Sequence, residues 1–457
     1  MTQTADRQQQ IDQLSPEVRS RLIAKLAERS RSTQRKVELL QTPADWLTLD
    51  RRALLNLFAA GEEAPVDAVS ITCLSDRVIG NGYALSDITH KFCGDLPMLT
   101  NVRELSIGRI ATLTLPRTYG QIYAESQDIV RLVQQSLRIS AMLGAKAVSL
   151  TGLIPSATDY GRAIRSEPGL PVMTTGHATT TSSVLLALKR LLDESGRRLA
   201  EEDLCFIGLG SVGTSTLRLM LSALEHPKRL TLCDVYGKRA DIEALMREIR
   251  DDLGYQGELR FVASQRVCPD EVYAATTVVG ATNAPNVLDI DRVRPGTLIV
   301  DDSDPHCFDA SRAIARFESA GDILFTEGGA LRAPDVIRHR IYVPEQFEWA
   351  LQYPVDDDNA HHITGCIFSS LLSAKYGYPT TLGYVKPEDA RTHLAGLVKY
   401  GFSAANLHCG PYRLARERID AFRRHHGGGA TEPAVLHVDD VPGQGRVHAA
   451  LAGTAAG

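Results

Sequence analysis

The chain has 457 residues, a formal net charge of −5 and an isoelectric point near 6.2. This length provides for two or three domains, and the acidic balance argues against nucleic acid as a partner. No segment reaches the roughly 18 apolar residues of a membrane helix, and the start MTQTADRQQQ lacks the apolar core of a signal peptide, so we expect a cytoplasmic protein without a membrane span.

Residues 1–60 are charged and predicted to be a helical extension. Ser15 and Pro16 make a helix start, with serine as the cap and proline in the first turn, and an apolar stripe follows. The stretch resembles the linker helices that follow carrier domains in nonribosomal peptide assembly lines. A plain N-terminal helix is the alternative.

Residues 61–177 are predicted to form an N-terminal substrate lobe. The run AVSITCLSDRVIGNGYAL indicates a strand or hairpin, and AKAVSL indicates a further strand. Between them, apolar residues recur at helical spacing from about Glu125 to Leu143.

Residues 178–335 are predicted to form a dinucleotide-binding domain that opens with a helix from about Ala178 to Glu194. The next stretch, LCFIGLGSVGTSTLRLMLSALEHPKRLTLCD, reads as strand, glycine-rich turn, helix and strand. Gly208 would make the tight turn, Gly210 would let the backbone approach a pyrophosphate, and Gly213 would let the helix pack on the strand. The helix from about Ser211 to Glu225 would hold the pyrophosphate at its N-terminus.

The second strand ends at Asp234, which occupies the ribose-binding position. A carboxylate there accepts from ribose hydroxyls and favours NAD(H), although Lys238 and Arg239 follow closely and suit a phosphate. The expected cofactor is therefore NADH or NADPH; a nucleotide-free domain with a tight turn is the alternative. The residues expected to bind the cofactor are Gly208, Gly210, Ser211, Val212, Gly213, Asp234 and Asn283.

Apolar strands then alternate with helical stretches at ELRFVA, TTVVGAT, TLIVDD and DILFTEGG. This alternation predicts an α/β fold, a Rossmann-type doubly wound parallel sheet, with a second α/β lobe built from the N-terminal and C-terminal segments. Asn283 follows the fourth strand, where ligands bind in such sheets; an asparagine that caps the loop is the alternative reading.

Residues 336–425 are predicted to be a helical segment with a nucleophile, Cys366. Asn359 and the acids before it make a helix start, which would place Cys366 in the second turn or later, so the helix dipole should contribute little to its acidity. His362, four residues earlier, would lie on the same helix face as a proton acceptor. An inert buried thiol is the alternative. Residues 426–457 are rich in glycine and alanine and are predicted to be a disordered tail.

From about residue 72 to 408 the order of motifs resembles the cyanobacterial long-chain fatty acyl–carrier-protein reductase family, which forms aldehydes. The matching strings are DRVIGNGYALSDITHKF, LRISAMLGAKAVSLTGLIPS, MTTGHATTTSSVLLALKRLL, FTEGGALR, TGCIFSSLLSAKYG and KYGFSAANL. The resemblance implies that Cys366 attacks an acyl thioester and that NADPH reduces the acyl-enzyme to a free aldehyde.

The chain departs from that family in its turn GLGSVG, in Asp234, in the His361–His362 pair, in the first 60 residues and in residues 99–125. These departures suggest another acyl group or carrier, so the expected partner is an acyl or peptidyl carrier protein bearing a thioester. Backbone N–H groups for the oxyanion are expected in the turns Thr174–Gly176 and Gly328–Gly329.

Three alternatives remain at this point. The first is a dehydrogenase or imine reductase of a small free substrate, with His362, His177 or His306 as proton donor and no covalent step. The second is a non-catalytic nucleotide-binding protein that docks to an assembly line. The third is a metal site among His306, Cys307, His361 and His362; because adjacent histidines rarely share an ion and no CxxC pair occurs, we expect no metal.

Overall fold

The chain divides into two compact units, and each unit is built from three separate segments of the sequence. The computed structural model describes residues 44–46, 58, 61, 63–74, 89, 95–124, 126–341, 359–430 and 432–438. The predicted helix that begins at Ser15 lies outside these residues. Unit 1 comprises Met1–Thr175, Asp335–His361 and Ser370–Leu382, and unit 2 comprises Gly176–Pro334, His362–Ser369 and Gly383–Gly457.

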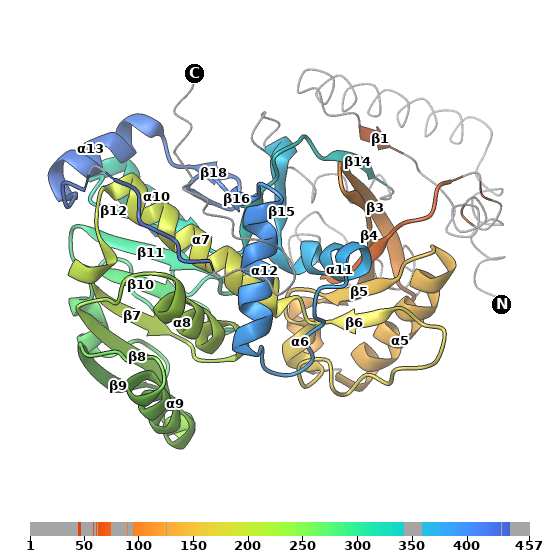
Figure 1. Ribbon diagram of the computed structural model, residues 1–457, viewed down its shortest axis with the longest axis horizontal. Coiled ribbons are helices and arrows are strands. Elements are labelled where there is room, and N and C mark those ends of the chain that lie inside the picture. Colours follow the sequence, from red (N-terminus) through yellow and green to blue (C-terminus); the bar gives the residue numbers. More distant parts are fainter. Residues whose placement is uncertain are drawn as a thin grey trace. The chain divides into compact units, whose positions relative to one another are not determined.

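A seven-stranded mixed sheet forms the centre of unit 1, in the order β1-β14-β3-β4-β2-β5-β6 (Figure 1). Strands β4, β2, β5 and β6 pair in parallel, whereas β14, β3 and β4 pair antiparallel. The strands are β1 Ala44–Trp46, β2 Ala68–Leu74, β3 Met98–Leu105, β4 Gly108–Thr118, β5 Ala147–Leu150, β6 Val172–Thr174 and β14 Arg338–Ile341.

The apolar core of unit 1 lies where helix α5 packs on β2 and β4. Helix α5 spans Ser126–Met142, close to the predicted bounds, and its predicted stripe Ile129, Leu132, Val133 and Leu137 is buried. The run predicted as a strand or hairpin forms β2 as a strand in a parallel pairing with β4 and β5, and its continuation after residue 74 lies outside the described residues. Two short helices complete the unit, α4 Tyr119–Ile122 and α6 Ile154–Ala157.

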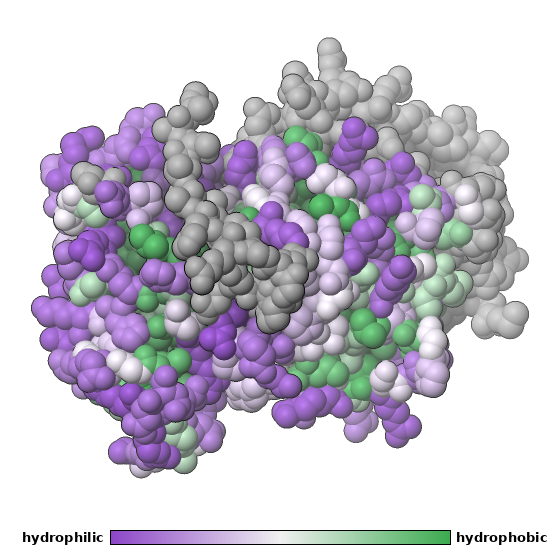
Figure 2. Space-filling view, viewed as in Figure 1, coloured by the Kyte–Doolittle hydropathy of each residue, from purple (hydrophilic) through white to green (hydrophobic). Residues whose placement is uncertain are grey.

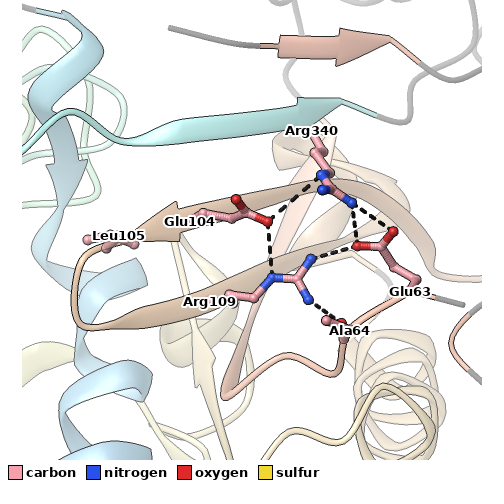
Figure 3. A pocket seen from close by; sticks show the side chains of 6 residues that line it. All are labelled: Glu63, Ala64, Glu104, Leu105, Arg109 and Arg340. Carbon is pink, nitrogen blue, oxygen red and sulfur yellow. Dashed lines mark hydrogen bonds and ion pairs between the residues drawn. The ribbon is translucent and has the colours of Figure 1, made fainter. Parts of the chain in front are cut away.

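A closed ion-pair network lines a surface hollow of unit 1, where Glu63 and Glu104 face Arg109 and Arg340 (Figure 3). Arg109 pairs with Glu63 at 2.6 Å and with Glu104 at 3.2 Å, and Arg340 pairs with Glu63 at 2.6 Å. These pairs tie β14 to β4 and to the chain before β2. Because each carboxylate here already faces two guanidinium groups, we assign the hollow a role in holding the strands together.

Unit 2 contains a six-stranded parallel sheet in the order β12-β11-β10-β7-β8-β9. All five pairings are parallel, as the strand–helix alternation predicts. The order reverses at β7, so the crossovers on its two sides cover opposite faces, and the predicted doubly wound fold is confirmed. The strands are β7 Asp203–Ile207, β8 Arg229–Val235, β9 Glu258–Ser264, β10 Thr277–Gly280, β11 Thr297–Asp301 and β12 Ile323–Glu327.

Helices pack against this sheet. Helix α7 spans His177–Ser195 and packs beside α8, Ser211–Ala223; both agree with the predicted helices. Helix α9, Arg239–Asp251, buries Ile242 and Ile249 and presents a mostly hydrophilic outer face (Figure 2). Three further helices in the unit are α10 Ala310–Ser319, α12 Pro387–Lys399 and α13 Arg416–His426.

The chain after β12 departs from the predicted helical segment, because it adds short strands before and between its helices. Strand β13, Ala330–Arg332, pairs antiparallel with β15, His362–Thr364, and with β16, Ser403–Ala404. Helix α11 follows β15 directly, over Gly365–Tyr376. A two-stranded ribbon joins β17, His408–Cys409, to β18, Tyr412–Arg413.

The predicted disordered tail is wrong for residues 427–430 and 432–438, which form hydrogen bonds with the rest of unit 2. Ala430 N donates to Gly196 O at 2.9 Å, Ala434 N to Asp193 Oδ1 at 2.7 Å, and His437 N to Ala223 O at 2.8 Å. Composition favours disorder there, but two backbone carbonyl groups and one carboxylate in the rest of unit 2 accept hydrogen bonds from the backbone of the segment. Within the described residues, no helix is both long enough and apolar enough to cross a membrane.

Candidate functional site

The glycine-rich turn after β7 admits no side chain at two positions. Gly208 has φ +87°, and a Cβ there would lie 2.5 Å from the Ala281 carbonyl oxygen; a Cβ at Gly213 would lie 2.0 Å from the Gly208 carbonyl oxygen. The turn, the first residues of α8 and the loop after β10 are thus pressed together. Glycine at these positions allows the close approach of helix and strand that the sequence predicts.

The start of α8 lacks a side-chain cap among the described residues. Gly210 occupies the N-cap position in extended conformation, and Ser211, Val212 and Gly213 form the first turn without an acidic residue. The first N–H groups of a helix need acceptors from outside the helix, and the helix dipole favours an anion there. This uncapped helix start beside a glycine turn fits the pyrophosphate of a dinucleotide.

Asp234, near the end of β8, holds the glycine-rich turn in place. Its Oδ2 accepts from Leu209 N at 2.7 Å and from Lys238 Nζ at 3.0 Å, and its Oδ1 accepts from Val235 N at 2.7 Å. The carboxylate is buried, at 7% exposure. Asp234 therefore shapes the turn in addition to occupying the position that in this fold contacts the adenosine ribose.

Asn283 is exposed in the loop after β10, at the same sheet edge. The loop is anchored just before it, because Thr282 N donates to Ser303 Oγ at 3.0 Å and Ala281 N to Ile207 O at 2.8 Å. In a sheet of this strand order, the carboxyl ends of β7 and β10 flank the crevice where a dinucleotide binds.

Cys366 lies in the first turn of α11, one turn earlier than the sequence predicts, because the helix begins at Gly365 and not among the residues near Asn359. Asn359–His361 forms a separate short 3-10 helix instead. Among the seven cysteines that the structure describes, six are buried and Cys366 is partly exposed. Its Sγ lies 3.4 Å from Thr364 Oγ1.

The start of α11 packs against the start of α7. A Cβ at Gly176, the N-cap of α7, would lie 2.8 Å from Cys366 Cα and 2.8 Å from its carbonyl oxygen. A Cβ at Gly365 would lie 2.3 Å from Ser183 Oγ and 3.1 Å from Thr179 O, both on α7. Cys366 therefore lies beside two helix N-termini, where the helix dipoles stabilise a thiolate.

Backbone hydrogen bonds fasten this pair of helix starts to the parallel sheet. Gly365 N donates to Gly329 O at 2.9 Å, and Gly329 follows the last residue of β12 by two positions. Strand pairing adds a second tie, with Ala330 of β13 opposite Thr364 of β15. Cys366 thus belongs to the carboxyl edge of the sheet that carries the glycine-rich turn.

His362 does not share a helix face with Cys366, and that prediction is wrong. It lies on β15, opposite Arg332 of β13, and its ring centroid is 5.6 Å from that of His408. The sequence spacing of four residues has meaning only inside a helix, and α11 begins after His362.

The other two histidines considered as proton donors differ in charge. Burial lowers the pKa of His177 to about 4, so its ring is neutral at neutral pH. A hydrogen bond to Asp301, together with one to Cys409, raises the pKa of His306 to about 11 and keeps that ring protonated. Only His306 of this pair therefore carries a proton to donate as an imidazolium at neutral pH.

The turns expected to stabilise an oxyanion have already used two of their donors. Thr175 N donates to Thr381 O at 2.8 Å, and Gly328 N donates to Asp301 O at 2.9 Å. The expectation is therefore wrong for these two N–H groups. Helix α7 begins beside Cys366, and its N-cap residue, Gly176, makes no side-chain cap hydrogen bond.

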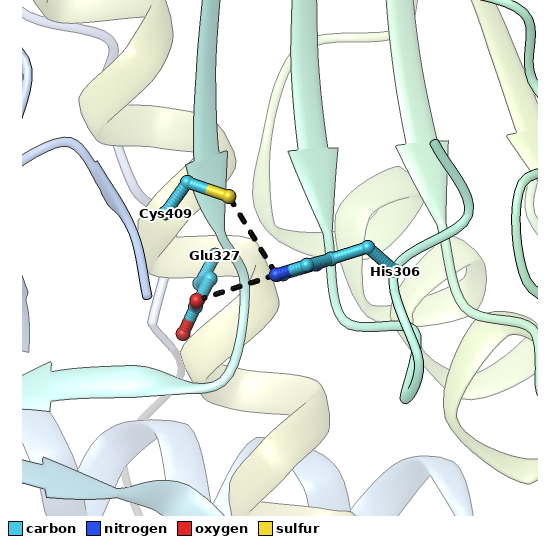
Figure 4. A group of neighbouring side chains, drawn as sticks. All are labelled: His306, Glu327 and Cys409. Atoms are coloured by element: carbon cyan, nitrogen blue, oxygen red, sulfur yellow. Dashed lines mark hydrogen bonds and ion pairs between the residues drawn. The ribbon is translucent and has the colours of Figure 1, made fainter. Parts of the chain in front are cut away.

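A polar cluster that includes Glu327 and Cys409 was not predicted. Glu327, the last residue of β12, meets His306 and Cys409 at the sheet edge (Figure 4). Asp301, the last residue of β11, is joined to this cluster because its Oδ2 lies 3.0 Å from His306 Nδ1. Burial raises the pKa of Glu327, but the hydrogen bond and charge of His408 more than offset this and lower it to about 2. The sequence did contain a signal for part of this cluster. Asp301 and Glu327 each end an apolar strand, and parallel strands bring their carboxyl ends to one edge of the sheet.

Of the four residues considered as metal ligands, only His306 joins a group of three potential ligands within the described residues. Cys307 is buried toward β10, because a Cβ at Gly280 would lie 2.7 Å from its Sγ. His361 and His362 fall in different units of the chain.

No protein-family model and no curated protein matches the sequence. Among solved structures, the chain is similar to the NAD+-bound 3-phosphoglycerate dehydrogenase of Entamoeba histolytica, with 10% identity and a TM-score of 0.23 over 67% of this chain and 93% of that one. It is similar to the malic enzyme of Pyrococcus horikoshii, with 14% identity and a TM-score of 0.32 over 83% and 90% of the chains. It is also similar to the aspartate transcarbamoylase of Trypanosoma cruzi, with 12% identity and a TM-score of 0.28 over 71% and 90%. Likenesses at this level establish no function for this chain.

Proposed function

We propose that this protein is an NADH- or NADPH-dependent reductase that converts a carrier-bound acyl thioester to an aldehyde through an S-acyl intermediate on Cys366. One observation carries the proposal. The partly exposed cysteine begins a helix whose first N–H bonds to Gly329, at the carboxyl edge of the sheet that holds the glycine-rich turn. The motif resemblance from about residue 72 to 408 also implies that Cys366 is the nucleophile.

Cys366 acts first as a nucleophile. Its thiolate attacks the carbonyl carbon of the carrier thioester, the new S–C bond forms, and the carrier leaves as a thiolate that takes up a proton. One thioester replaces another, so the exchange is nearly balanced in free energy. The exchange moves the acyl group from a mobile carrier to a fixed position at the sheet edge.

Two groups of backbone N–H donors assist this step. The N-termini of α7 and α11 meet at Cys366, and their helix dipoles would stabilise its thiolate form before attack. The uncapped first turn of α7 is the best-placed source of donors for the oxyanion of the tetrahedral intermediate.

The start of α8, the turn at Gly208, Asp234 and Asn283 would hold the dinucleotide. When bound, the reduced nicotinamide supplies a hydride to the acyl carbon. The Cys366–acyl bond then breaks, the electron pair returns to sulfur, and the aldehyde leaves. In this scheme Cys366 is regenerated as a thiolate, ready for the next carrier.

Trapping the acyl group tests the proposal directly. Incubation of wild-type protein with an acyl-carrier thioester, without nicotinamide, should add the mass of one acyl group in intact-mass measurement. Cys366→Ala should show no adduct, and its turnover with NADH or NADPH should fall by about 10³-fold or more. Cys268→Ala is the matched control, because Cys268 is buried, and it should acylate like wild type.

An adduct that persists in Cys366→Ala would remove this cysteine from the mechanism. Full turnover in that variant would favour the non-covalent alternative, for which the structure offers one observation, the hydrogen bond of 3.0 Å between His306 Nδ1 and Asp301 Oδ2. The partner is identified by comparing kcat/KM for the same acyl group on an acyl carrier protein, on a peptidyl carrier protein and on a small thiol. The carrier with the highest kcat/KM is the preferred partner.

A further inference from the structure

The cluster of His306, Glu327 and Cys409 lies outside the proposed acyl-transfer step. His306 follows β11, Glu327 is the last residue of β12, and Cys409 is the last residue of β17. Three separate segments of the chain therefore bring an imidazole, a carboxylate and a thiol to one point, and the three side chains face one another (Figure 4).

Two of the three distances within the cluster are close to those around one tetrahedral ion. His306 Nε2 lies 3.5 Å from Cys409 Sγ and 3.6 Å from Glu327 Oε1, and the three potential ligand atoms all lie within 4.8 Å of one another. Usual zinc bond lengths at tetrahedral angles place a nitrogen about 3.5 Å from a sulfur and about 3.4 Å from an oxygen. The cluster thus needs little rearrangement to close on a zinc ion.

Outer hydrogen bonds orient two of these ligands. His306 Nδ1 lies 3.0 Å from Asp301 Oδ2, and when Nδ1–H donates to that carboxylate, the Nε2 lone pair faces Glu327 and Cys409. Gly410 N donates to Glu327 Oε1. A carboxylate behind a ligating histidine is the usual arrangement around zinc in proteins.

The local charge also favours a cation. Asp301 and Glu327 are the last residues of two adjacent strands, and a coordinating Cys409 thiolate adds a third negative charge. Bound zinc would offset much of this charge. Binding releases the proton of the Cys409 thiol and any proton on His306 Nε2 to solvent.

We propose that His306, Glu327 and Cys409 bind one zinc ion, with a fourth position open to water or to a carbonyl oxygen. The mixed nitrogen, sulfur and oxygen donors suit zinc, whereas magnesium and calcium take oxygen ligands. The side chains of His306 and Glu327 are 28% and 31% exposed, so the site is reachable from solvent. Three protein ligands and an open position are the pattern of zinc sites that polarise a substrate.

Metal analysis of the full-length protein tests this proposal. Protein produced with added zinc and freed of loosely bound metal should contain about one zinc per chain by elemental mass spectrometry. His306→Ala and Cys409→Ser should each lower the zinc content at least tenfold. Cobalt in place of zinc should give a thiolate charge-transfer band that disappears in Cys409→Ser.

Two matched controls keep the test specific. Cys307→Ala removes a buried thiol next to His306 but outside the ligand set, and Cys366→Ala removes the proposed nucleophile; both should retain zinc. Circular dichroism checks that each variant is folded, and Glu327→Gln, which keeps the size of the side chain, serves if another ligand variant unfolds.

A zinc-free wild type that also fails to take up zinc in a titration would overturn the site. Retention of zinc in both His306→Ala and Cys409→Ser would overturn it as well. If the protein contains no zinc and Cys409 is alkylated rapidly, Cys409 and His306 would be assigned to thiol chemistry and the zinc site would be rejected. None of these results bears on acylation of Cys366, so this inference and the proposed function fail independently.

Discussion

At the scale of single residues, the glycine-rich turn after β7 requires that two positions carry no side chain. Gly213 lies against the carbonyl oxygen of Gly208, and Gly208 lies against that of Ala281. The contacts are with backbone, which cannot rotate away as a side chain can. A Cβ at either position must therefore move α8 or the loop after β10.

Gly213→Ala is expected to abolish NADH and NADPH binding in calorimetry and to lower the free energy of unfolding by about 1–3 kcal/mol, because overpacking displaces the helix from the strand. Gly237→Ala is the control, since a Cβ there meets nothing within 4 Å. It should bind and unfold like wild type. Wild-type affinity in Gly213→Ala would show that this turn does not hold the cofactor.

Another feature at this scale is the contrast between Cys366 and Cys409. Cys366 is partly exposed beside two helix starts, whereas Cys409 is buried and faces an imidazole and a carboxylate. A nucleophile must meet its substrate, and a metal ligand needs only its ion. The two thiols are therefore suited to different chemistry at the same sheet edge.

At the scale of secondary structure, the meeting of α7 and α11 positions the proposed nucleophile. Gly176 has φ +75° and no space for a Cβ next to Cys366. Two effects thus act at one residue, a left-handed backbone and a steric contact with the backbone of the neighbouring helix.

Gly176→Ala is expected to slow acylation of Cys366 by at least tenfold, because the start of α11 must shift away from α7. Gly254→Ala separates the two effects, since Gly254 also has positive φ, at +66°, but a Cβ there meets nothing within 4 Å. It should lose about 1–2 kcal/mol of stability from backbone strain and retain its acylation rate. Equal acylation rates in both variants would argue against positioning by this contact.

At the scale of the whole molecule, two partly buried histidines predict a loss of stability in mild acid. Burial lowers the pKa of His177 to about 4, and burial together with the charge of Arg103 lowers that of His339 to about 3, against 6.5 as the ordinary value. Above pH 6.5 both rings are neutral in the folded and the unfolded chain and have no effect. Between pH 6.5 and 4 the unfolded chain binds protons that the folded chain does not, so folding becomes less favourable.

Urea unfolding at pH 7.5 and pH 5 should therefore show lower stability at pH 5, with a contribution on the order of 1–3 kcal/mol from His177. His177→Gln should reduce this dependence on pH. His425→Gln changes an exposed histidine of α13 and should leave the dependence as in wild type. An unchanged dependence in His177→Gln would contradict the assignment of a neutral ring to His177.

Two kinds of information were available from the sequence by itself. Strand and helix positions from β7 to β12, the strand–turn–helix at Gly208 and the helices α5, α7 and α8 follow from residue periodicity and glycine spacing, which act over a few neighbouring residues. Cys366 was found through motif order, although its helix begins later in the chain than the acids before it suggest. The placement of His362 beside it on a helix was wrong for the same reason.

Only the tertiary structure brought His306, Glu327 and Cys409 together and placed Gly176 against Cys366. These residues are separated by 21 to 190 positions, for example 327 − 306 = 21 and 366 − 176 = 190, so no local pattern relates them. Their contacts arise because parallel pairing aligns the carboxyl ends of β11 and β12 and because β13, β15 and β17 return the later chain to that edge. Local sequence determines which elements form, and the pairing of distant strands decides which side chains meet.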